Sequence, residues 1–403
     1  MNVVLLGAGG GMGAMAARHL SRTPGIDRLV CSDTTTDAAS RTLAQLGGGA
    51  VDVQVKAVDI LDPTALRHLL DDADLVLSCA GPFFRLGVPA VEAAIDTRTT
   101  YVDICDDPAP TAAMLALNDR ARAAGVGAVI GMGASPGVSN LLAARAARHL
   151  DAVHDCYTAW PLDIPVPGST HTATDEAVTV DGGPAAAAIH LMEQIAGRVA
   201  VVEGGEMTSQ PPLRPVHLQY PGRALGTGYV VGHPEPLTLQ RSLGLTGSSA
   251  CLMLLQPTTL AFLRGLQRDL DRGRLDHHTA ASAIARPAAL RSLRAWFGSR
   301  GVADHGGLPE FFVLLTGTKD GVPTSVGCHL AAAPQGMDGI TAIPAVLAIR
   351  QLLERPIAPG VHAPEAVIDP DQLLHDLLPH CEPAVGSVDE LAPLAISPRP
   401  RSA

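Results

Sequence analysis

The sequence predicts an α/β protein, a Rossmann-type doubly wound parallel sheet with an inserted α+β second domain. Three observations predict this class. An apolar strand at residues 3–6 runs directly into a glycine-rich turn and an alanine-rich helix. An acidic residue, Asp33, follows about 20 residues later at the end of the next apolar strand. Strands then alternate with helices as far as residue 131, which is typical of a parallel sheet whose ligands bind beyond the carboxyl ends of its strands.

The glycine-rich turn is the first candidate site. Its spacing fits the start of G-x-G-x-x-G with the closing glycine one place late, and it fits G-x-x-G-x-x-G equally well. Glycines let the backbone turn tightly and approach a pyrophosphate at the helix N-terminus, although any tight strand-to-helix corner favours glycine. The cofactor-binding residues predicted in this turn are Gly7, Gly9, Gly10, Gly11, Met12 and Gly13.

Asp33 is predicted to bind the adenosine ribose of that cofactor. A carboxylate accepts hydrogen bonds from the 2′- and 3′-hydroxyls but repels a 2′-phosphate, so it favours NAD over NADP. Two alternatives stay open: Asp33 as the N-cap of the next helix, and Arg41 as the residue that decides cofactor specificity. The predicted cofactor is therefore NAD or NADP, with NAD favoured.

Further strands and helices of the first domain extend the candidate site. The strands are expected at residues 51–58, 74–79, 100–104 and 127–131, and the helices at residues 63–70, 90–95 and 112–124. Because the carboxyl ends of parallel strands share one edge, the residues that follow the strands should lie beside the glycine-rich turn. They add five cofactor-binding predictions: Asp59, Ile60, Ala80, Gly81 and Pro82.

Beyond residue 138 the strand–helix alternation ends. A hairpin is predicted over residues 311–330, because Asp320 and Gly321 supply the positive φ angles of a tight turn. Further strands are expected at residues 152–160 and 215–220, and helices at residues 139–150, 258–270, 287–297 and 343–353. The predicted parts are a dinucleotide-binding domain (1–137), an α+β substrate and dimerisation domain (138–335), a segment without a strand of its own that packs back on the first domain (336–384), and a disordered tail (385–403).

Composition limits the class of function. The net charge of −11 argues against nucleic-acid binding, which demands clustered Lys and Arg. The seven cysteines are scattered and never spaced C-x-x-C, and no H-x-x-x-H or H-E-x-x-H appears, so we expect reduced thiols, a cytoplasmic protein and no metal site. No apolar run approaches the length of a membrane span, and the first strand leaves no room for a signal peptide.

Four stretches form a more specific pattern: Cys79-Ala-Gly-Pro-Phe83, Val91-Glu-Ala-Ala-Ile95, Tyr101-Val-Asp-Ile-Cys-Asp-Asp-Pro108 and Gly133-Ala-Ser-Pro-Gly-Val-Ser-Asn140. This pattern resembles the saccharopine dehydrogenase superfamily. The resemblance covers the first 145 residues and returns weakly at residues 341–344 and 359–365. It implies a nucleotide-binding domain followed by a mixed domain with substrate and dimer contacts, and hydride transfer at a carbon bonded to nitrogen, through an imine.

One position departs from the pattern of that superfamily. Ser135 stands where relatives that bind amino acids or polyamines carry an aspartate, which suits an ammonium group. The absence of that aspartate removes a charge-assisted contact and argues against saccharopine or a simple polyamine as the substrate. Glu310 is either a contact for a cationic substrate or only the lead into the hairpin. The predicted substrate-binding residues are Cys105, Ser135, Asn140 and Glu310.

Hydride transfer also needs a group that donates or accepts a proton. Asp103, Asp106 and Asp107 are candidates at the sheet edge, with helix capping as the alternative for Asp106 and Asp107. Two loop histidines of the second domain are candidates because imidazole titrates near neutrality, although a loop histidine is usually only solvated. The predicted catalytic residues are Asp106, His171 and His305.

The sequence therefore predicts an NAD(P)-dependent oxidoreductase that acts at the carbon–nitrogen bond of a small amino-acid-like or amine-like substrate. The alternative is a protein that binds a dinucleotide without turnover and uses it for regulation or assembly. The expected partners are a small-molecule substrate and a second copy in a homodimer, with neither nucleic acid nor a membrane among them.

Overall fold

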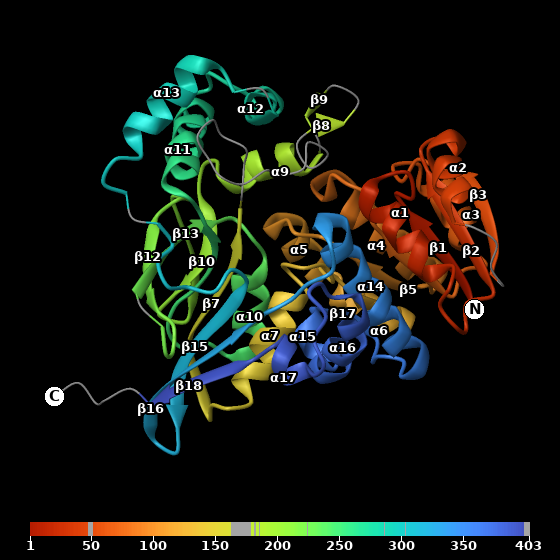
Figure 1. The fold of residues 1–403 in the computed structure, drawn as a ribbon. Coiled ribbons are helices and arrows are strands. Elements are labelled where there is room, and N and C mark those ends of the chain that lie inside the picture. The colour runs from red at the N-terminus through yellow and green to blue at the C-terminus, as the bar shows by residue number, and fades with distance from the viewer. Residues whose placement is uncertain are drawn as a thin grey trace. The chain divides into compact units, whose positions relative to one another are not determined.

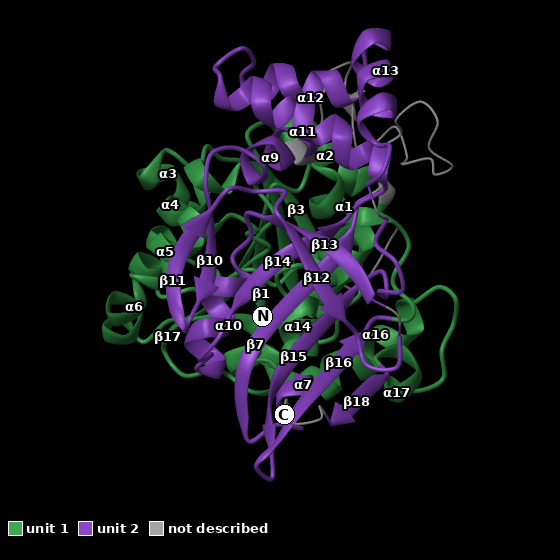
Figure 2. Cartoon of the chain, turned by 90° about the vertical axis from the view of Figure 1, so that its left-hand side faces the viewer, with its two compact units in different colours: residues 1–144, 331–392 green, residues 145–330, 393–403 purple. Residues whose placement is uncertain are grey.

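The computed structural model divides the chain into two compact units (Figure 2). Unit 1 comprises residues 1–144 and 331–392, and unit 2 comprises residues 145–330 and 393–403. The C-terminal segment from residue 331 thus belongs to the unit that contains the N-terminus. The structure describes residues 1–46, 51–162, 179–180, 183–184, 186–223, 225–285, 287–302 and 304–398.

Unit 1 is built on a sheet of seven parallel strands in the order β17-β6-β5-β4-β1-β2-β3 (Figure 1). This is the strand order of a Rossmann fold with one strand added beside β6. The strands are β1 (Asn2–Leu6), β2 (Arg28–Asp33), β3 (Asp52–Ala57), β4 (Leu75–Ser78), β5 (Thr100–Asp103), β6 (Gly127–Val129) and β17 (Gly360–His362). The predicted fold class is confirmed.

Helices connect these strands and cover the sheet. Those of the first part of unit 1 are α1 (Gly11–Leu20), α2 (Thr36–Gln45), α3 (Pro63–Leu70), α4 (Phe83–Thr97), α5 (Pro108–Leu115), α6 (Asn118–Ala124) and α7 (Val138–Ala147), which runs on into unit 2. Those of the C-terminal segment are α14 (Gly336–Glu354), α15 (Pro364–Val367), α16 (Pro370–Leu377), the short 3₁₀ helix η1 (Leu378–His380) and α17 (Val388–Leu391).

The register of the sheet aligns the carboxyl ends of four strands. Leu6 of β1 pairs with Ser32 of β2 and with Ser78 of β4, and Ser78 pairs with Asp103 of β5. All four residues of β4 are buried, as expected when both faces of a parallel sheet are covered. The segments that follow these strands therefore meet at one edge of the sheet.

Two predictions for unit 1 are wrong. The helix expected over residues 112–124 is two helices, because the chain leaves helical hydrogen bonding near Leu117 and restarts at Asn118, whose side chain accepts a hydrogen bond from Val361 N (3.2 Å). The C-terminal segment was expected to contribute no strand, yet it supplies β17. That strand has only three residues, too few for an alternation pattern to reveal it.

Unit 2 contains a mixed sheet of nine strands, most of them antiparallel. The path β11-β10-β14-β7-β15-β16-β18 is joined by β13, which pairs with β14 and β12. The strands are β7 (Ala152–Pro161), β10 (Val199–Glu203), β11 (Glu206–Gln210), β12 (Pro215–Gln219), β13 (Leu225–Val231), β14 (Ser249–Leu254), β15 (Phe312–Lys319), β16 (Val322–His329) and β18 (Leu394–Pro398). A separate two-stranded sheet comprises β8 (Thr179–Val180) and β9 (Gly183–Pro184).

The predicted hairpin is confirmed in the strands β15 and β16. Lys319 pairs with Val322 across a turn in which Asp320 and Gly321 have φ angles of 51° and 73°. The helices of unit 2 are α9 (Ala186–Gln194), α10 (Glu235–Leu243), α11 (Pro257–Asp271), α12 (His277–Ala285) and α13 (Ala289–Gly298). The positions of α11 and α13 agree with the helices expected from the sequence.

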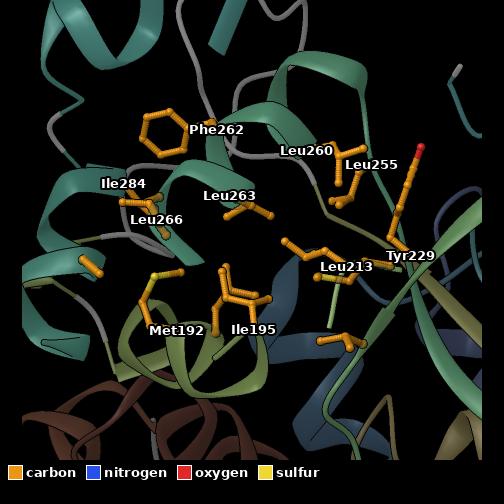
Figure 3. Packing of buried hydrophobic residues seen from close by; sticks show 14 of the residues in the cluster. Met192, Ile195, Leu213, Tyr229, Leu255, Leu260, Phe262, Leu263, Leu266 and Ile284 are labelled. Carbon is orange, nitrogen blue, oxygen red and sulfur yellow. The ribbon is translucent and has the colours of Figure 1, made fainter. Parts of the chain in front are cut away.

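The largest core cluster of unit 2 forms where helices pack on the sheet (Figure 3). Met192 and Ile195 lie opposite Leu263 and Leu266 of α11, and all four side chains are buried. Burial of each such side chain stabilises the fold by about 1.5–3 kcal/mol relative to exposure. This cluster fixes α9, α11 and α12 as one helical layer.

The prediction of a disordered tail is wrong between Val388 and Pro398. Residues 388–391 form α17, and residues 394–398 form β18, which pairs antiparallel with β16 over five residues. The Pro- and Ser-rich composition indicated disorder, but the backbone hydrogen bonds of an available sheet edge order the strand.

Helix α14 is the one helix in the described part of the chain that is long and apolar enough to cross a membrane. Its mean hydropathy is 1.2 over the most apolar window, of which 56% is buried inside the structure. The sequence was expected to contain no such run. Because α14 packs against α1, α16 and β5 of unit 1, it has the surroundings of a core helix.

Candidate functional site

The predicted cofactor-binding residues meet at the carboxyl edge of the unit 1 sheet. The amides of Gly7 and Ala8 both donate to the carbonyl of Ser32 at the end of β2 (2.9 and 3.0 Å). On the other side, a Cβ added to Gly7 would lie 2.8 Å from Ala80 Cα in the segment after β4. The turn after β1 is therefore held between the segments that follow its two neighbouring strands.

Two glycines of this turn are required by geometry. Gly7 has a φ of +80°, which a residue with a side chain rarely adopts. A Cβ on Gly13 would overlap the carbonyl oxygen of Gly7 and lie 2.9 Å from Ala8 Cα. Backbone atoms cannot move aside as a flexible side chain can, so α1 begins directly on the turn only because position 13 has no side chain.

The first turn of α1 is left open toward solvent at Gly10. Gly10 occupies the N-cap position and has no side chain to cap the helix, and a Cβ there would find no atom nearer than 3.7 Å. Gly10 and Gly11 are exposed, and Met12 is half-buried. A helix N-terminus suits an anion, so the open side of this turn at Gly10 fits the pyrophosphate of a dinucleotide, whereas the Asp338 carboxylate lies over Gly11.

Asp33 is fixed by hydrogen bonds to its own turn and to the glycine-rich turn. Its Oδ2 accepts from Gly9 N (2.9 Å), and its Oδ1 accepts from Thr34 N (2.8 Å). The N-cap of α2 is Thr35, whose hydroxyl accepts from Ala38 N (3.4 Å), so the capping alternative for Asp33 is wrong. Arg41 lies exposed on α2.

The other cofactor-binding predictions also lie at this edge. Asp59 follows β3, is exposed, and accepts a hydrogen bond from Leu61 N (2.9 Å), whereas Ile60 is buried. Gly81 and Pro82 are exposed before α4, and a Cβ on Gly81 would meet nothing within 4 Å. Ala80 is buried against the turn after β1. The space beside Gly81 is therefore open.

Asp103 is a carboxylate in the core rather than at the surface. It is fully buried at the end of β5, where its Oδ1 accepts from Gly131 N (2.7 Å) and Cys105 N (3.0 Å). Among the described residues its Oδ2 has no hydrogen-bond partner. Burial raises the pKa of Asp103 to about 6, and the two amide hydrogen bonds oppose a larger rise. Asp103 thus fixes the backbone of two segments at the sheet edge.

The three residues after Ile104 differ in accessibility. Cys105 is fully buried, with its Sγ 3.6 Å from the Thr111 hydroxyl, and burial raises the pKa of its thiol. The predicted contact of Cys105 with a substrate stays a prediction, and this burial does not support it. Asp107 is buried at the N-cap of α5 and makes no capping hydrogen bond. Asp106 is half-buried and remains the carboxylate of this segment nearest to solvent.

Asn140 supports the loop that contains Ser135. It is fully buried, its Oδ1 accepts from Gly137 N (3.1 Å), and its Nδ2 donates to Glu365 Oε2 (2.8 Å). Its predicted role in substrate binding stays a prediction, and these contacts do not support it. Ser135 itself is half-buried in this loop.

The predicted site residues of the second domain are not assembled by the structure into one group. His171 lies outside the described residues. His305 is half-buried, and Glu310 is exposed in front of β15. Both belong to unit 2, so their roles stay predictions.

Unit 2 contains a buried cluster of possible metal ligands. His233 Nδ1 lies 3.0 Å from Glu235 Oε2, and Cys251 Sγ lies 3.9 Å from Glu235 Oε1. Sequence spacing missed this cluster, because its members come from a loop, the start of α10 and the strand β14. The three groups contact one another, so hydrogen bonding within the cluster accounts for its burial.

Sequence reasoning also missed two acidic residues of the C-terminal segment. Asp338 of α14 covers Gly11, and Glu365 of α15 binds Asn140. Thr341 lies against the loop before Ser135, since a Cβ on Gly133 would lie 3.3 Å from Thr341 Cγ2. The weak return of the family pattern at residues 341–344 and 359–365 was the available signal for two of these contacts.

Gly13→Ala should destabilise unit 1, because the added methyl overlaps backbone atoms. We expect the free energy of unfolding to fall by about 1–3 kcal/mol, the usual cost of overpacking. Gly10→Ala is the matched control, since its methyl meets open space. Urea unfolding monitored by circular dichroism measures both variants. Equal stability of the two would contradict the close contact between α1 and the turn.

Asp103→Asn should change the pH dependence of stability. Folded Asp103 keeps its proton up to about pH 6, whereas the unfolded chain loses it near pH 4. The carboxyl group therefore favours the folded state below about pH 4 and loses that advantage as pH rises through 6. Relative to the parent, the Asn variant should gain about 3 kcal/mol in free energy of unfolding between pH 4 and 7. Urea unfolding at several pH values measures this, and a constant difference would refute it.

The first part of unit 1 is similar to known proteins. Residues 3–129 match the family model of the saccharopine dehydrogenase NADP binding domain. The trans-acting enoyl reductase of Mycobacterium leprae is 31% identical over 103 residues, and that of Mycobacterium tuberculosis is 29% identical over 103 residues. Each match covers 26% of this chain and 25% of the relative, so it spans about a quarter of either protein.

A solved structure extends the likeness to the fold of the chain. Saccharopine dehydrogenase (L-Glu forming) from Saccharomyces cerevisiae superposes with a TM-score of 0.61 and 16% identity, covering 93% of this chain and 96% of that chain. At this identity the likeness concerns the fold. The family model thus covers less than a third of the chain, and the solved structure shows that the chain shares the fold of saccharopine dehydrogenase.

Proposed function

We propose that this chain is an oxidoreductase that uses a nicotinamide dinucleotide. The observation that supports this most is the turn after β1, in which positions 7 and 13 exclude side chains and Gly10 leaves the first turn of α1 open. The family model that matches residues 3–129 is named for NADP binding. When bound, a nicotinamide dinucleotide supplies or accepts a hydride.

Residues of unit 1 would hold the dinucleotide along the sheet edge. The open N-terminus of α1 at Gly10 suits the pyrophosphate, and the Asp33 carboxylate suits the adenosine ribose. The open backbone at Gly81 suits the nicotinamide. These assignments use the three segments that follow β1, β2 and β4, which the register places side by side.

The choice between NAD and NADP depends on Asp33. Its carboxylate is held by Gly9 N and Thr34 N, so its negative charge cannot readily turn away from a 2′-phosphate. This favours NAD. The name of the matching family model favours NADP, and exposed Arg41 would then be the partner of the 2′-phosphate.

Asp33→Ala should weaken binding of NADH more than binding of NADPH. Loss of hydrogen bonds to a charged acceptor should reduce NADH affinity by about 1–3 kcal/mol. Asp33→Asn, which keeps an acceptor for Gly9 N, controls for loosening of the turn. Titration calorimetry measures both cofactors, and tighter binding of NADPH by the unmodified protein would transfer the specificity role to Arg41.

We further propose that the reaction takes place at a carbon–nitrogen bond, as the resemblance of the sequence to the saccharopine dehydrogenase superfamily implies. Carbon–carbon double bonds are the second candidate, because the matching relatives are named enoyl reductases. Both likenesses leave the substrate open. Ser135 gives the loop after β6 a neutral hydroxyl, so a strongly cationic substrate is disfavoured there. A cytoplasmic location and a homodimer stay predictions from the sequence.

Asp106→Asn should slow turnover with little effect on cofactor affinity. A lost acid–base group typically reduces the rate by about 10²–10⁴-fold, and Asn has nearly the same shape as Asp. The assay follows the absorbance of reduced nicotinamide with imines formed from keto acids and amines, and separately with enoyl thioesters. His305→Ala tests the competing assignment. Full activity in Asp106→Asn together with inactivity in His305→Ala would move the proton relay to unit 2.

The same assay distinguishes an enzyme from a protein that binds a dinucleotide without turnover. Tight binding of the dinucleotide without turnover of either substrate class would support a protein that binds the cofactor for regulation or assembly. Turnover of enoyl thioesters alone would favour the second candidate reaction.

A further inference from the structure

Helix α13 exposes the kind of side chains that helices normally bury. Its inward face has the small residues Ser292 and Ala295, which are buried, while its bulky apolar residues are exposed. Their exposed fractions are 59% for Leu290, 51% for Leu293, 48% for Trp296 and 53% for Phe297. These four residues are called the apolar face of α13. Single exposed apolar residues are ordinary, but four on one helix mark a contact surface.

A neighbouring cation lies close to both aromatic residues of this face. The rings of Trp296 and Phe297 lie edge to face with centroids 4.9 Å apart. The guanidinium of Arg300 lies 4.7 Å from the Trp296 centroid and 4.9 Å from the Phe297 centroid. The apolar face therefore has a positive charge at its C-terminal end.

A cavity rich in arginine adjoins the same helix. It has a volume of about 840 Å³ and is lined by residues of α11, α13 and the chain near Leu213. One acidic residue, Asp269, lines it and pairs with two of the arginines, at 3.6 Å from Arg274 and 2.9 Å from Arg291. In a chain with a net charge of −11, this local excess of positive charge is unusual. The arginines of the cavity are Arg264, Arg268, Arg272, Arg274, Arg291 and Arg294.

We propose that the apolar face of α13 and the arginine cavity together form a docking surface for an anionic phospholipid bilayer. Leu, Trp and Phe side chains partition to the boundary between headgroups and acyl chains, and arginine binds lipid phosphate groups. Helix α13 lies at the outer edge of the helical layer of unit 2 in both views (Figures 1 and 2). The aromatic side chains of a projecting helix can enter a flat bilayer more readily than they can fill a concave pocket of a partner protein.

Two other occupants fit the surface less well. A second copy bound by two-fold symmetry would bring the same patch to itself, so the arginines of one copy would face those of the other. A small soluble anion would explain the cavity but not the exposed aromatic residues. The proposal revises the expectation of no membrane partner, which rested on the absence of a spanning segment and did not consider the surface.

Vesicle binding of the full chain tests the proposal independently of any enzyme activity. Sedimentation with vesicles of phosphatidylcholine, with and without phosphatidylglycerol, measures the partition constant. We expect binding only to the anionic vesicles, weakened by salt. Each of Arg268→Gln and Arg294→Gln should reduce binding about fivefold, the contribution of one basic residue near an anionic bilayer. The exposed Arg241 and Leu225 of unit 2 provide the matched controls, Arg241→Gln and Leu225→Ala.

Tryptophan fluorescence adds a readout specific to α13, because the chain has two tryptophans and Trp160 is half-buried. A blue shift on adding anionic vesicles, absent in Trp296→Phe, would support insertion of the apolar face. Vesicle binding that ignores lipid charge or survives the double variant Trp296→Ala, Phe297→Ala would overturn the proposal. The proposal would also be overturned if the protein formed a dimer that the double variant abolishes and did not bind vesicles. The same blue shift with inorganic pyrophosphate alone would overturn it as well.

Discussion

The close contact between α1 and the turn after β1 is the constraint on which the candidate site depends. Because position 13 has no side chain, the helix begins against the carbonyl of Gly7 and its first turn lies at the sheet edge. Asp33 then ties the end of β2 to the same turn through Gly9 N. Two backbone contacts and one carboxylate thus place the N-terminus of α1 beside Asp33, and the proposed dinucleotide site rests on this arrangement.

A second constraint lies one strand farther along the sheet. Asp103 accepts hydrogen bonds from Cys105 N and Gly131 N, and its carbonyl accepts from Met132 N (2.7 Å). The buried carboxyl therefore joins the segment that contains Asp106 to the loop that leads to Ser135. Burying it raises its pKa, so the fold tolerates an electrostatic cost to keep these two segments together. Such a cost is common at functional sites.

What the sequence could predict was local. The glycine spacing, the strand–helix alternation and the Asp320-Gly321 turn are set by neighbouring residues, and the structure agrees with them. The contacts that bury the predicted site residues are distant in sequence. Asn140 and Glu365 are 225 residues apart, and their hydrogen bond gives Asn140 a part in supporting the loop. Burial of Cys105 likewise depends on the packing of α5, which no spacing in the sequence reveals.

The helix α13 shows how far a sequence pattern can describe a surface. An amphipathic pattern predicts that a helix forms and that its two faces differ, but it leaves open which face meets the protein. In α13 the small residues Ser292 and Ala295 allow close approach to α11, so the bulky apolar residues are left outside. Packing against α11 decides which face of α13 points outward. Only the three-dimensional packing shows that no described residue covers this apolar face.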